Sequence, residues 1–317
     1  MNDSLIPNIH SPLIARIKYG FIAQHNARIS ILRDDLNHPI VSGNKLRKLH
    51  YPLRHAQSEG YSGVISLGGA YSNHLHALAY ACLEQKLNCI TVVRGEQTAE
   101  LNNTLRDIES WGARIHFVSR SEYKHRHHAE WQDQLLQQLT PDHASWMFLP
   151  EGGSHTLSMQ GFEDIFSAHT EHFDYIACAV GSGGTTAGLA LAMAPHQRLI
   201  AVPAVRDSQL PKRVKQLIQD DSVFERIDWL TGYEWGGFAK FPNMLEQFVL
   251  EFTQQSGVLT DPVYTSKLVY AINDQLRLGQ FDHSDEIMLY HSGGLQGWRG
   301  FLPKVSQEMR DCVAKFR

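Results

Sequence analysis

The sequence predicts an α/β protein of two domains, with mostly parallel sheets flanked by helices. Short apolar runs alternate along the chain with longer segments of helical periodicity, a pattern typical of parallel strands joined by crossover helices. The chain has 317 residues, of which 43% are hydrophobic, and this composition supports one large core or two medium ones. Three glycine-rich loops follow predicted strands, at the end where parallel sheets usually bind their ligands.

The predicted strands form two series, which indicates two domains. The first series lies at residues 63–67, 88–93, 113–118 and 146–149, with helices expected at 75–85, 100–111 and 121–139. The second series lies at 175–180, 198–202 and 286–290, with helices expected near 185–193, 208–219, 243–256 and 266–278. We therefore expect a smaller domain at 44–150 and a larger domain from 1–43 plus 151–317, with a site where the loops of both meet.

The net charge and the apolar pattern limit the partners. A formal net charge of −4 gives no general attraction to nucleic acid or anionic lipid, which basic proteins prefer. No run of about eighteen consecutive apolar residues occurs, and the first residues lack the apolar core of a signal peptide. We expect a cytoplasmic protein that binds small molecules, with no nucleic-acid partner and no membrane span.

Neither the cysteines nor the histidines predict a metal site. The four cysteines form no CxxC pair, and we expect all of them to be reduced. The densest histidines, His125, His127 and His128, lie in a polar stretch without partner ligands at a defined spacing. We expect a solvated helix face there.

The segment GSGGTTAGLA, residues 181–190, suits a phosphate group. A strand, a glycine-rich turn and a helix start bring several backbone N–H groups around one point, and the hydroxyls of Ser182, Thr185 and Thr186 can add donors. The segment lacks the GK[ST] of a Walker loop and the acidic partner of a dinucleotide-binding fold. A tight turn with glycines for packing alone is the alternative.

The segment SGNKLRKL, residues 42–49, offers a lysine for covalent chemistry. A lysine that forms an imine must be partly neutral, which burial or nearby positive charge can achieve. Arg47 and Lys48 lie close to Lys45 in the sequence. A lysine at a basic helix start is, on its own, more often a solvated surface residue.

Two further segments are candidates for the same site. In GGAYSNHLHALA, residues 68–79, Ser72 and Asn73 stand at a predicted helix start, where N–H groups and a hydroxyl can hold a carboxylate or simply cap the helix. In YHSGGLQG, residues 290–297, Ser292 follows the last predicted strand and either faces the site or caps the final helix.

Together these segments resemble the fold type II pyridoxal-phosphate (PLP) enzymes, in the group that contains D-cysteine desulfhydrase and 1-aminocyclopropane-1-carboxylate (ACC) deaminase. The motifs follow the family's order over nearly the whole chain: GNKLRKL, GGAYSN, GSGGTTAGL, DPVYTSK and HSGG. The resemblance implies the tryptophan synthase beta-like fold, PLP as the cofactor, a small amino acid as the substrate and a homodimer.

The resemblance also implies a role for each site residue. Lys45 bonds the cofactor as an imine and moves the proton at the substrate α-carbon. Ser72 and Asn73 contact the substrate, and Asn73 also bonds the phenolic oxygen of the cofactor. Tyr264 and Tyr233 face the substrate, although a tyrosine such as Tyr264 can also be a core aromatic. The phosphate cup comprises Ser182, Gly183, Gly184, Thr185 and Thr186.

The partner of the pyridine nitrogen favours one activity. The ACC deaminase that the chain resembles carries Glu after the tyrosine of DPVY, and a carboxylate would keep that nitrogen protonated. This chain has Thr265 there, and a hydroxyl from Thr265 or Ser292 leaves the nitrogen largely neutral, which suits β-elimination. Either hydroxyl can instead cap a helix.

We therefore expect a PLP-dependent lyase that converts D-cysteine into pyruvate, ammonia and sulfide. The first alternative is deamination of ACC or of another amino acid. The second is a PLP-binding protein without turnover, against which the retention of Lys45 together with Ser72 and Tyr264 speaks, because storage of the cofactor needs only the imine and the phosphate cup.

Overall fold

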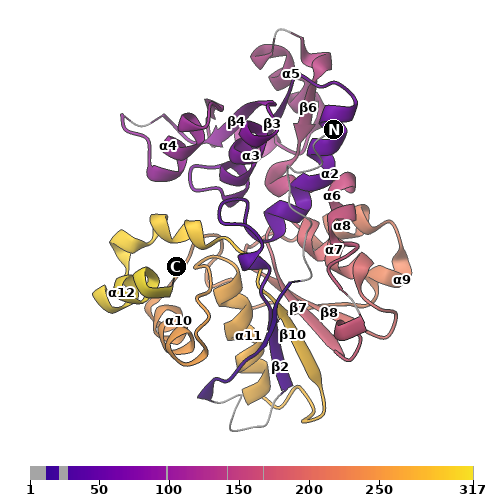
Figure 1. Ribbon diagram of the computed structural model, residues 1–317, viewed down its shortest axis with the longest axis vertical. Helices are drawn as coiled ribbons and strands as arrows, with labels where there is room; N and C mark the ends of the chain where they lie inside the picture. The colour runs from indigo at the N-terminus through magenta and orange to yellow at the C-terminus, as the bar shows by residue number, and fades with distance from the viewer. Residues whose placement is uncertain (1–11, 21–27, 98, 141, 167, 317) are drawn as a thin grey trace. The chain divides into compact units, whose positions relative to one another are not determined.

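The computed structural model describes residues 12–20, 28–97, 99–140, 142–166 and 168–316, which form two compact units (Figure 1). The first unit comprises His38–Val41 and Lys45–Gly161. The second comprises the described residues of Ile9–Asn37, Ser42–Asn44 and Phe162–Arg317. We propose that these units are the two domains expected from the sequence, with a boundary near Gly161 rather than residue 150.

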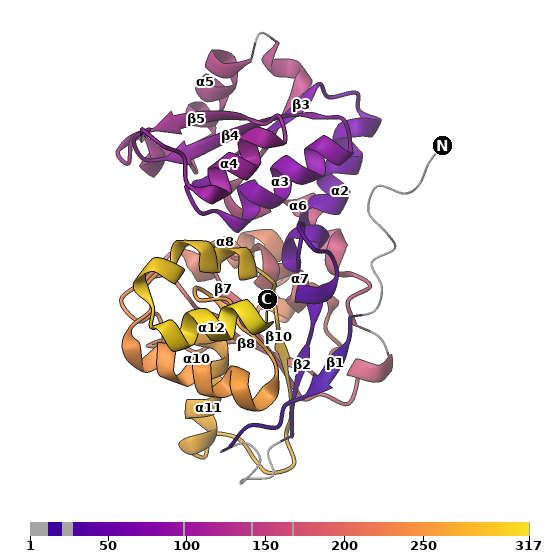
Figure 2. The same ribbon diagram turned by 60° about the vertical axis from the view of Figure 1, so that its left-hand side comes forward.

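The first unit is built on a four-stranded parallel sheet in the order β5-β4-β3-β6. Its elements are α2 (Asn44–Ser58), β3 (Gly63–Gly69), α3 (Asn73–Glu84), β4 (Asn88–Arg94), α4 (Asn103–Ser110), β5 (Arg114–Val118), α5 (Ala129–Leu139), β6 (Trp146–Leu149) and α6 (Thr156–Met159). Because side chains alternate along a strand, one face packs Ile65, Leu67 and Val92 against Leu135 and Leu136 of α5. Figure 2 shows α3 and α4 on the opposite face of this sheet.

The second unit is built on a six-stranded sheet in the order β1-β2-β10-β7-β8-β9, in which only the β1–β2 pair is antiparallel. Its strands are β1 (Ile14–Arg16), β2 (Arg28–Leu32), β7 (Tyr175–Val180), β8 (Arg198–Pro203), β9 (Ile227–Trp229) and β10 (Glu286–Tyr290). Its helices are α7 (Gly184–Ala192), α8 (Leu210–Ile218), α9 (Asp221–Phe224), α10 (Asn243–Ser256), α11 (Thr265–Arg277) and α12 (Gln307–Phe316).

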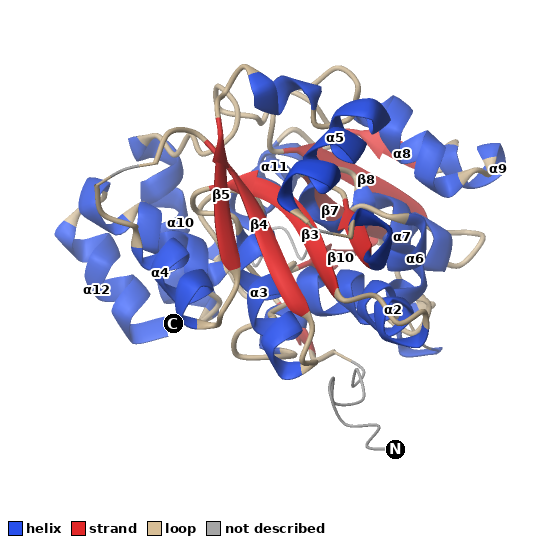
Figure 3. Ribbon diagram, turned by 90° about the horizontal axis from the view of Figure 1, so that it is seen from above, coloured by secondary structure: helices blue, strands red, loops and turns tan. Residues whose placement is uncertain are grey.

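Helices cover both faces of the second sheet, and this explains its continuous apolar strands. Ile29, Ile31 and Leu289 pack on one face with the buried residues of α10, α11 and α12. On the other face, the Cys178 thiol of β7 lies 3.6 Å from the Thr186 hydroxyl of α7. Figure 3 distinguishes these strands, in red, from the helices, in blue.

Most predicted elements are present, and two differences stand out. The strands β1, β2 and β9 have no counterpart in the prediction. The helix expected at 121–139 is wrong in its first turns: Glu122–His125 is a 3₁₀ turn, and α5 begins only after His128, whose backbone is extended. The histidine cluster therefore lies at a break between helices and not on one helix face.

The structure also bears on the cysteines, on metal sites and on membrane spans. All four cysteines are free and buried. Within the described residues, no group of three or more His, Cys, Asp or Glu side chains is arranged to hold a metal ion. No helix in the described part of the chain is long and apolar enough to cross a bilayer.

One close contact between loop and helix gives a test of the packing in the second unit. A Cβ atom added at Gly188 of α7 would lie 2.3 Å from a ring carbon of Phe162, which is fully buried. We expect Gly188→Ala to lower the free energy of unfolding by about 1–3 kcal/mol, because the core must shift to admit the methyl group. Urea unfolding measures this difference.

Gly69→Ala is the matched control, since the nearest atom to its added methyl group would be 3.9 Å away. We expect this variant to stay within about 0.5 kcal/mol of the parent protein. Equal losses in both variants would contradict the packing argument.

Candidate active site

The glycine-rich loop after β7 leads directly into α7. Gly183 is the N-cap residue in the left-handed conformation, with φ 98°, which favours glycine. The backbone N–H groups of Gly184, Thr185 and Thr186 begin the helix and have no acceptor within it. A Cβ atom at Gly183 would lie 2.8 Å from Val214. The loop therefore presents a helix N-terminus with free donors, the geometry that holds a phosphate.

The DPVYT segment packs against this loop. A Cβ atom at Gly181 would lie 2.9 Å from a ring carbon of Tyr264, so the ring covers the start of the loop. Asp261, fully buried, accepts hydrogen bonds from the backbone N–H groups of Val263, Tyr264 and Thr265 at 2.7–2.9 Å. The Asp261 carboxylate thus accepts the backbone N–H groups at the start of α11, and these hydrogen bonds hold the backbone of Tyr264 and Thr265 in place.

Thr265 is fully buried, and its hydroxyl has no hydrogen-bond partner among the described residues. It is the first residue of α11, and it does not cap the helix, because Asp261 supplies the acceptor for these N–H groups. A buried hydroxyl without a partner is costly. Thr265 thus offers a free donor and acceptor close to Tyr264.

The residues that precede Lys45 are bonded to the same region of the second unit. Asn44 donates from its side chain to the Thr185 hydroxyl at 2.7 Å, and from its backbone to the Ser292 carbonyl at 3.2 Å. Gly43 is held on both sides by Asn37, which accepts from its N–H at 2.8 Å and donates to its carbonyl at 3.1 Å. The second unit therefore brings together Ser42–Asn44, the phosphate-type loop and the HSGG loop.

The HSGG loop crosses Ser42–Asn44 at very short range. A Cβ atom at Gly43 would lie 2.1 Å from the Ser292 carbonyl oxygen, and one at Gly293 would lie 2.7 Å from the Ser42 hydroxyl. Both glycines also have positive φ, 66° and 77°. Ser292 follows β10 and precedes Leu295–Gly300, a 3₁₀ helix whose N-cap is Gly294, so Ser292 caps neither this helix nor α12.

Lys45 and Lys48 lie one turn apart at the start of α2 in the first unit. Lys48 is almost completely buried, and its ammonium group donates to the Gly152 carbonyl. Burial, and then the charge of Lys45, hold the pKa of Lys48 well below its usual value. Arg47 is fully buried and donates to the Gly161 carbonyl at 3.4 Å. Positive charge beside Lys45 favours a neutral amine there.

A buried histidine of α3 faces the same two lysines. Ser66 gives its only proton to the Leu149 carbonyl at 2.7 Å, so the 2.8 Å contact between Ser66 and His74 requires the proton on Nε2 of His74. Nδ1 then carries a lone pair, and it has no partner among the described residues. Burial, followed by the charges of Lys48 and Lys45, lowers the pKa of His74 well below its usual value.

Ser72 and Asn73 stand at the N-terminus of α3, as the sequence predicts. The Ser72 hydroxyl accepts from the Leu75 N–H at 3.2 Å and caps the helix. This bond uses one lone pair of the hydroxyl, so its proton remains available to a ligand. Asn73 is the first residue of the helix.

Within the second unit, the Tyr233 hydroxyl is bonded to α11 well beyond Tyr264. Its hydroxyl donates to Asp274 and accepts from Gln275, both at 2.7 Å. Asp274 lies nine residues along α11 from Thr265, or about 14 Å at the rise of a helix. The Tyr233 hydroxyl is therefore used near the far end of α11, and its expected role in substrate binding stays a prediction.

Several residues of the site were missed by sequence analysis. Lys267 donates to the carbonyls of Ala204, Glu234 and Gly237 at 2.9–3.0 Å, and burial lowers its pKa to about 8. It ties the loop at 232–238 to α11, and the Phe238 ring of this loop lies 6.3 Å from that of Tyr264. Asn37 and His74 gave no sequence signal, since their roles depend on contacts between distant segments.

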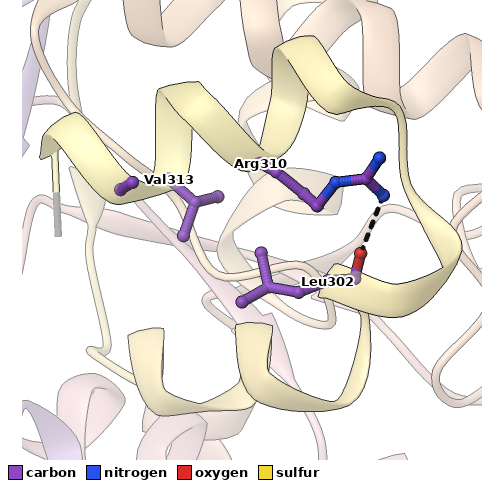
Figure 4. Close-up of a pocket in the computed structure, with 4 residues that line it drawn as sticks. Leu302, Arg310 and Val313 are labelled. Carbon is purple, nitrogen blue, oxygen red and sulfur yellow. Dashed lines mark hydrogen bonds between the residues drawn. The ribbon is translucent and has the colours of Figure 1, made fainter.

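A surface pocket of about 400 Å³ lies elsewhere in the second unit. Its lining comprises Leu302, Arg310, Val313 and Ala314, none of which is a predicted site residue. Figure 4 shows the Arg310 guanidinium turned to the Leu302 carbonyl. Arg310 donates from Nε to Gln307 and from Nη1 to the carbonyls of Leu302 and Val305.

Comparison with known proteins identifies the family. Residues 11–293 match the pyridoxal-phosphate dependent enzyme family. The chain belongs to this family. It is 30% identical to a putative ACC deaminase of Thermotoga maritima, over 88% of this chain and 91% of the relative. It is 27% identical to the D-cysteine desulfhydrase of Serratia proteamaculans, over 87% and 89%.

A solved structure agrees with this assignment. The crystal structure of an ACC deaminase homologue matches 99% of this chain and 95% of its own, with a TM-score of 0.79 and 25% identity. The protein is thus a PLP-dependent enzyme of fold type II, with mostly parallel sheets flanked by helices, and the cofactor inferred from the sequence is confirmed.

The residues present fit PLP. The N-terminus of α7 and its hydroxyls suit the phosphate group, and the unpartnered hydroxyl of Thr265 suits a ring nitrogen. Lys45 follows Asn44, which is bonded to Thr185 of the proposed phosphate cup. The roles of the individual residues stay predictions.

We expect Asn37→Ala to weaken PLP binding, because Gly43 then loses both side-chain hydrogen bonds. Loss of these bonds corresponds to about a tenfold rise in the Kd for PLP. Fluorescence titration of the apoprotein with PLP measures it. Asn88→Ala is the control, since Asn88 also donates to a backbone carbonyl, that of Ser62, but lies outside the site. An unchanged Kd in Asn37→Ala would contradict the role of the two Asn37–Gly43 hydrogen bonds in PLP binding.

We expect His74 to make stability depend on pH. The folded state holds the pKa of His74 low, whereas the unfolded chain takes up a proton near pH 6.5. The free energy of unfolding should therefore fall as pH is lowered through 6.5, by up to about 1.4 kcal/mol per pH unit from this residue.

Urea unfolding of the parent protein and of His74→Gln between about pH 7.5 and pH 5 isolates this contribution. The glutamine retains a donor for Ser66, and its curve should be shallower below about pH 6.5. The exposed His169 supplies the control His169→Gln. Parallel curves for parent and His74→Gln would refute the assignment.

Proposed function

We propose that the protein catalyses β-elimination on a small amino acid, with D-cysteine as the substrate and pyruvate, ammonia and sulfide as the products. The observation that supports this is Thr265, which directly follows Tyr264 and whose buried hydroxyl has no hydrogen-bond partner in the described part of the chain. A hydroxyl at the pyridine nitrogen would leave it largely neutral. In β-elimination the electrons depart with the leaving group, so a strong electron sink is not needed.

When bound, PLP withdraws electron density from the substrate α-carbon and makes its proton acidic. In the proposal, Lys45 is the amine that bonds the cofactor and the base that removes this proton. Arg47 and Lys48 are buried beside Lys45, and the positive charge of Arg47 favours a neutral amine at Lys45. Ser72, with the N-terminus of α3, binds the substrate carboxylate.

The proposed reaction balances without a further reactant. The α-C–H and β-C–S bonds break, a double bond forms between the two carbons, and sulfide leaves with its electron pair. The Tyr264 hydroxyl, on the ring that lies against Gly181, is positioned in the proposal to give the sulfur a proton. Water then hydrolyses the released enamine to pyruvate and ammonia.

The alternative within the family is the opening of ACC to 2-oxobutyrate and ammonia. The relative from Thermotoga maritima bears the name of this activity, and a likeness of 30% does not distinguish the two. The ring of ACC has no group that leaves with the electrons in one step, and the absence of a carboxylate after Tyr264 disfavours this alternative.

Two further properties are proposed from the resemblance alone. The protein is expected to be a homodimer, which light scattering of the purified protein tests. It is expected in the cytoplasm, which fractionation of the native cells tests.

We expect the PLP-loaded protein to release pyruvate from D-cysteine faster than 2-oxobutyrate from ACC. Lys45→Ala should lower this rate by about 10²- to 10⁴-fold, as loss of a general base does. Keto-acid release, followed with lactate dehydrogenase, measures both. Lys86→Ala, at an exposed turn after α3, controls for the loss of a lysine. Faster release from ACC, or full activity of Lys45→Ala, would refute the proposal.

A further inference from the structure

Arg94 occupies the carboxyl end of β4, beside the GGAYSN loop. It is the last residue of its strand and pairs in parallel register with Gly69, the last residue of β3. A Cβ atom at Gly69 would lie 3.9 Å from an Nη atom of Arg94. The guanidinium therefore lies against the first residue of the turn that leads to Ser72.

An aromatic ring holds this guanidinium in place. The Cζ atom of Arg94 lies 5.5 Å from the ring centroid of Tyr123, within the range of a cation–π contact. Tyr123 is only 2% exposed, and its hydroxyl donates to Glu151 at 2.7 Å. The ring is thus a fixed platform, and the position of Arg94 does not depend on a carboxylate.

The neighbouring arginine on the same ring is neutralised, whereas Arg94 is not. Arg126 lies 5.2 Å from the Tyr123 centroid and donates to Glu151 at 2.7 Å. The two carboxylate oxygens of Glu151 are therefore taken by Tyr123 and Arg126. Among the described residues, Arg94 makes no side-chain hydrogen bond or ion pair, and its side chain is exposed. Its donors are available to an anion.

The turn from Gly69 to Ser72 leads from the end of β3 to the N-terminus of α3. The Ser72 N–H donates to the Gly69 carbonyl at 2.9 Å, which closes a tight turn. The turn is held further by Asn102, which donates to the Ala70 carbonyl at 3.0 Å. Arg94 therefore lies beside the first residue of this turn, and the last residue of the turn, Ser72, is the N-cap of α3.

We propose that Arg94 gives amino acids whose β-substituent carries a negative charge, such as a sulfate or carboxylate group, a binding advantage over those with an uncharged substituent, such as D-cysteine. This inference rests on the proposed function and specifies its substrate class. The α-carboxylate binds at Ser72 and the N-terminus of α3, and the charged substituent pairs with the guanidinium, which can form two parallel hydrogen bonds to such a group.

Serine O-sulfate is a suitable probe of this class. Its elimination breaks the α-C–H and β-C–O bonds, forms the double bond between the carbons, and releases sulfate with the electron pair. Water then converts the enamine to pyruvate and ammonia, so no oxidant or reductant is needed. β-Chloroalanine gives the same products with chloride as the leaving group and has no charged substituent.

The test compares kcat/KM for these two substrates, each as both enantiomers, in the PLP-loaded protein. We expect the ratio for serine O-sulfate over β-chloroalanine to fall about 10- to 100-fold in Arg94→Met, the loss that follows removal of a charged hydrogen-bond donor. Arg94→Lys should retain part of the ratio, because the charge remains. Arg106→Met, which removes an exposed arginine of α4 paired with Glu100, should leave the ratio unchanged.

A binding measurement separates recognition from turnover. Aspartate has a β-carboxylate in place of a leaving group, and alanine lacks it. In calorimetric titrations, the parent protein should bind aspartate more tightly than alanine, and Arg94→Met should lose about 10- to 100-fold of this difference.

The possible failures are distinct. If the parent protein eliminates β-chloroalanine but neither measurement responds to Arg94→Met, the role of Arg94 is refuted while the proposed function stands. If the parent protein produces no pyruvate from either substrate or from D-cysteine, the proposed function itself is refuted.

Discussion

The backbone of Ser42–Asn44 is the constraint on which the proposed site depends. Gly43 is glycine for two reasons: its φ of 66°, and the Ser292 carbonyl that would lie 2.1 Å from any Cβ atom. Asn37 then holds Gly43 itself, and Thr185 holds the next residue, Asn44. The next residue is Lys45, whose amine the family resemblance assigns to the cofactor. The contacts of residues 42–44 therefore set where the backbone of Lys45 begins.

In the first unit, the corresponding constraint is that two basic side chains are buried without a carboxylate partner among the described residues. Lys48 donates to a carbonyl, and His74 is neutral with a bare Nδ1. Neither is paired with a carboxylate among the described residues, so desolvation lowers the pKa of each.

Sequence reasoning succeeded where the signal was local. The strands at 146–149, 175–180 and 286–290 were predicted with their observed bounds, because each is a short apolar run bounded by turn residues. Local signals failed at β2, because no predicted helix precedes its run RISIL. They also failed at the start of α5, because one polar stretch contains both a 3₁₀ turn and a helix.

The site shows the same division. The glycine loop and Ser72 stand at predicted helix starts, whereas the hydroxyl of Tyr233 is used near the far end of α11. The role of Asn37 was not predictable from the sequence, because it depends on hydrogen bonds to Gly43, six residues further along the chain.

Two features in separate units favour the same kind of chemistry. A hydroxyl such as that of Thr265, in place of a carboxylate, would limit how much negative charge the cofactor can store, so turnover would depend on a group that departs readily with its electrons. Sulfate departs as a stable anion, and Arg94 is a fixed guanidinium without a carboxylate partner among the described residues. When the cofactor can store little negative charge, turnover depends on the leaving group, so recognition of that group by the protein is most useful. Selection for an anionic substituent by the first unit would therefore suit the proposed electronics of the second.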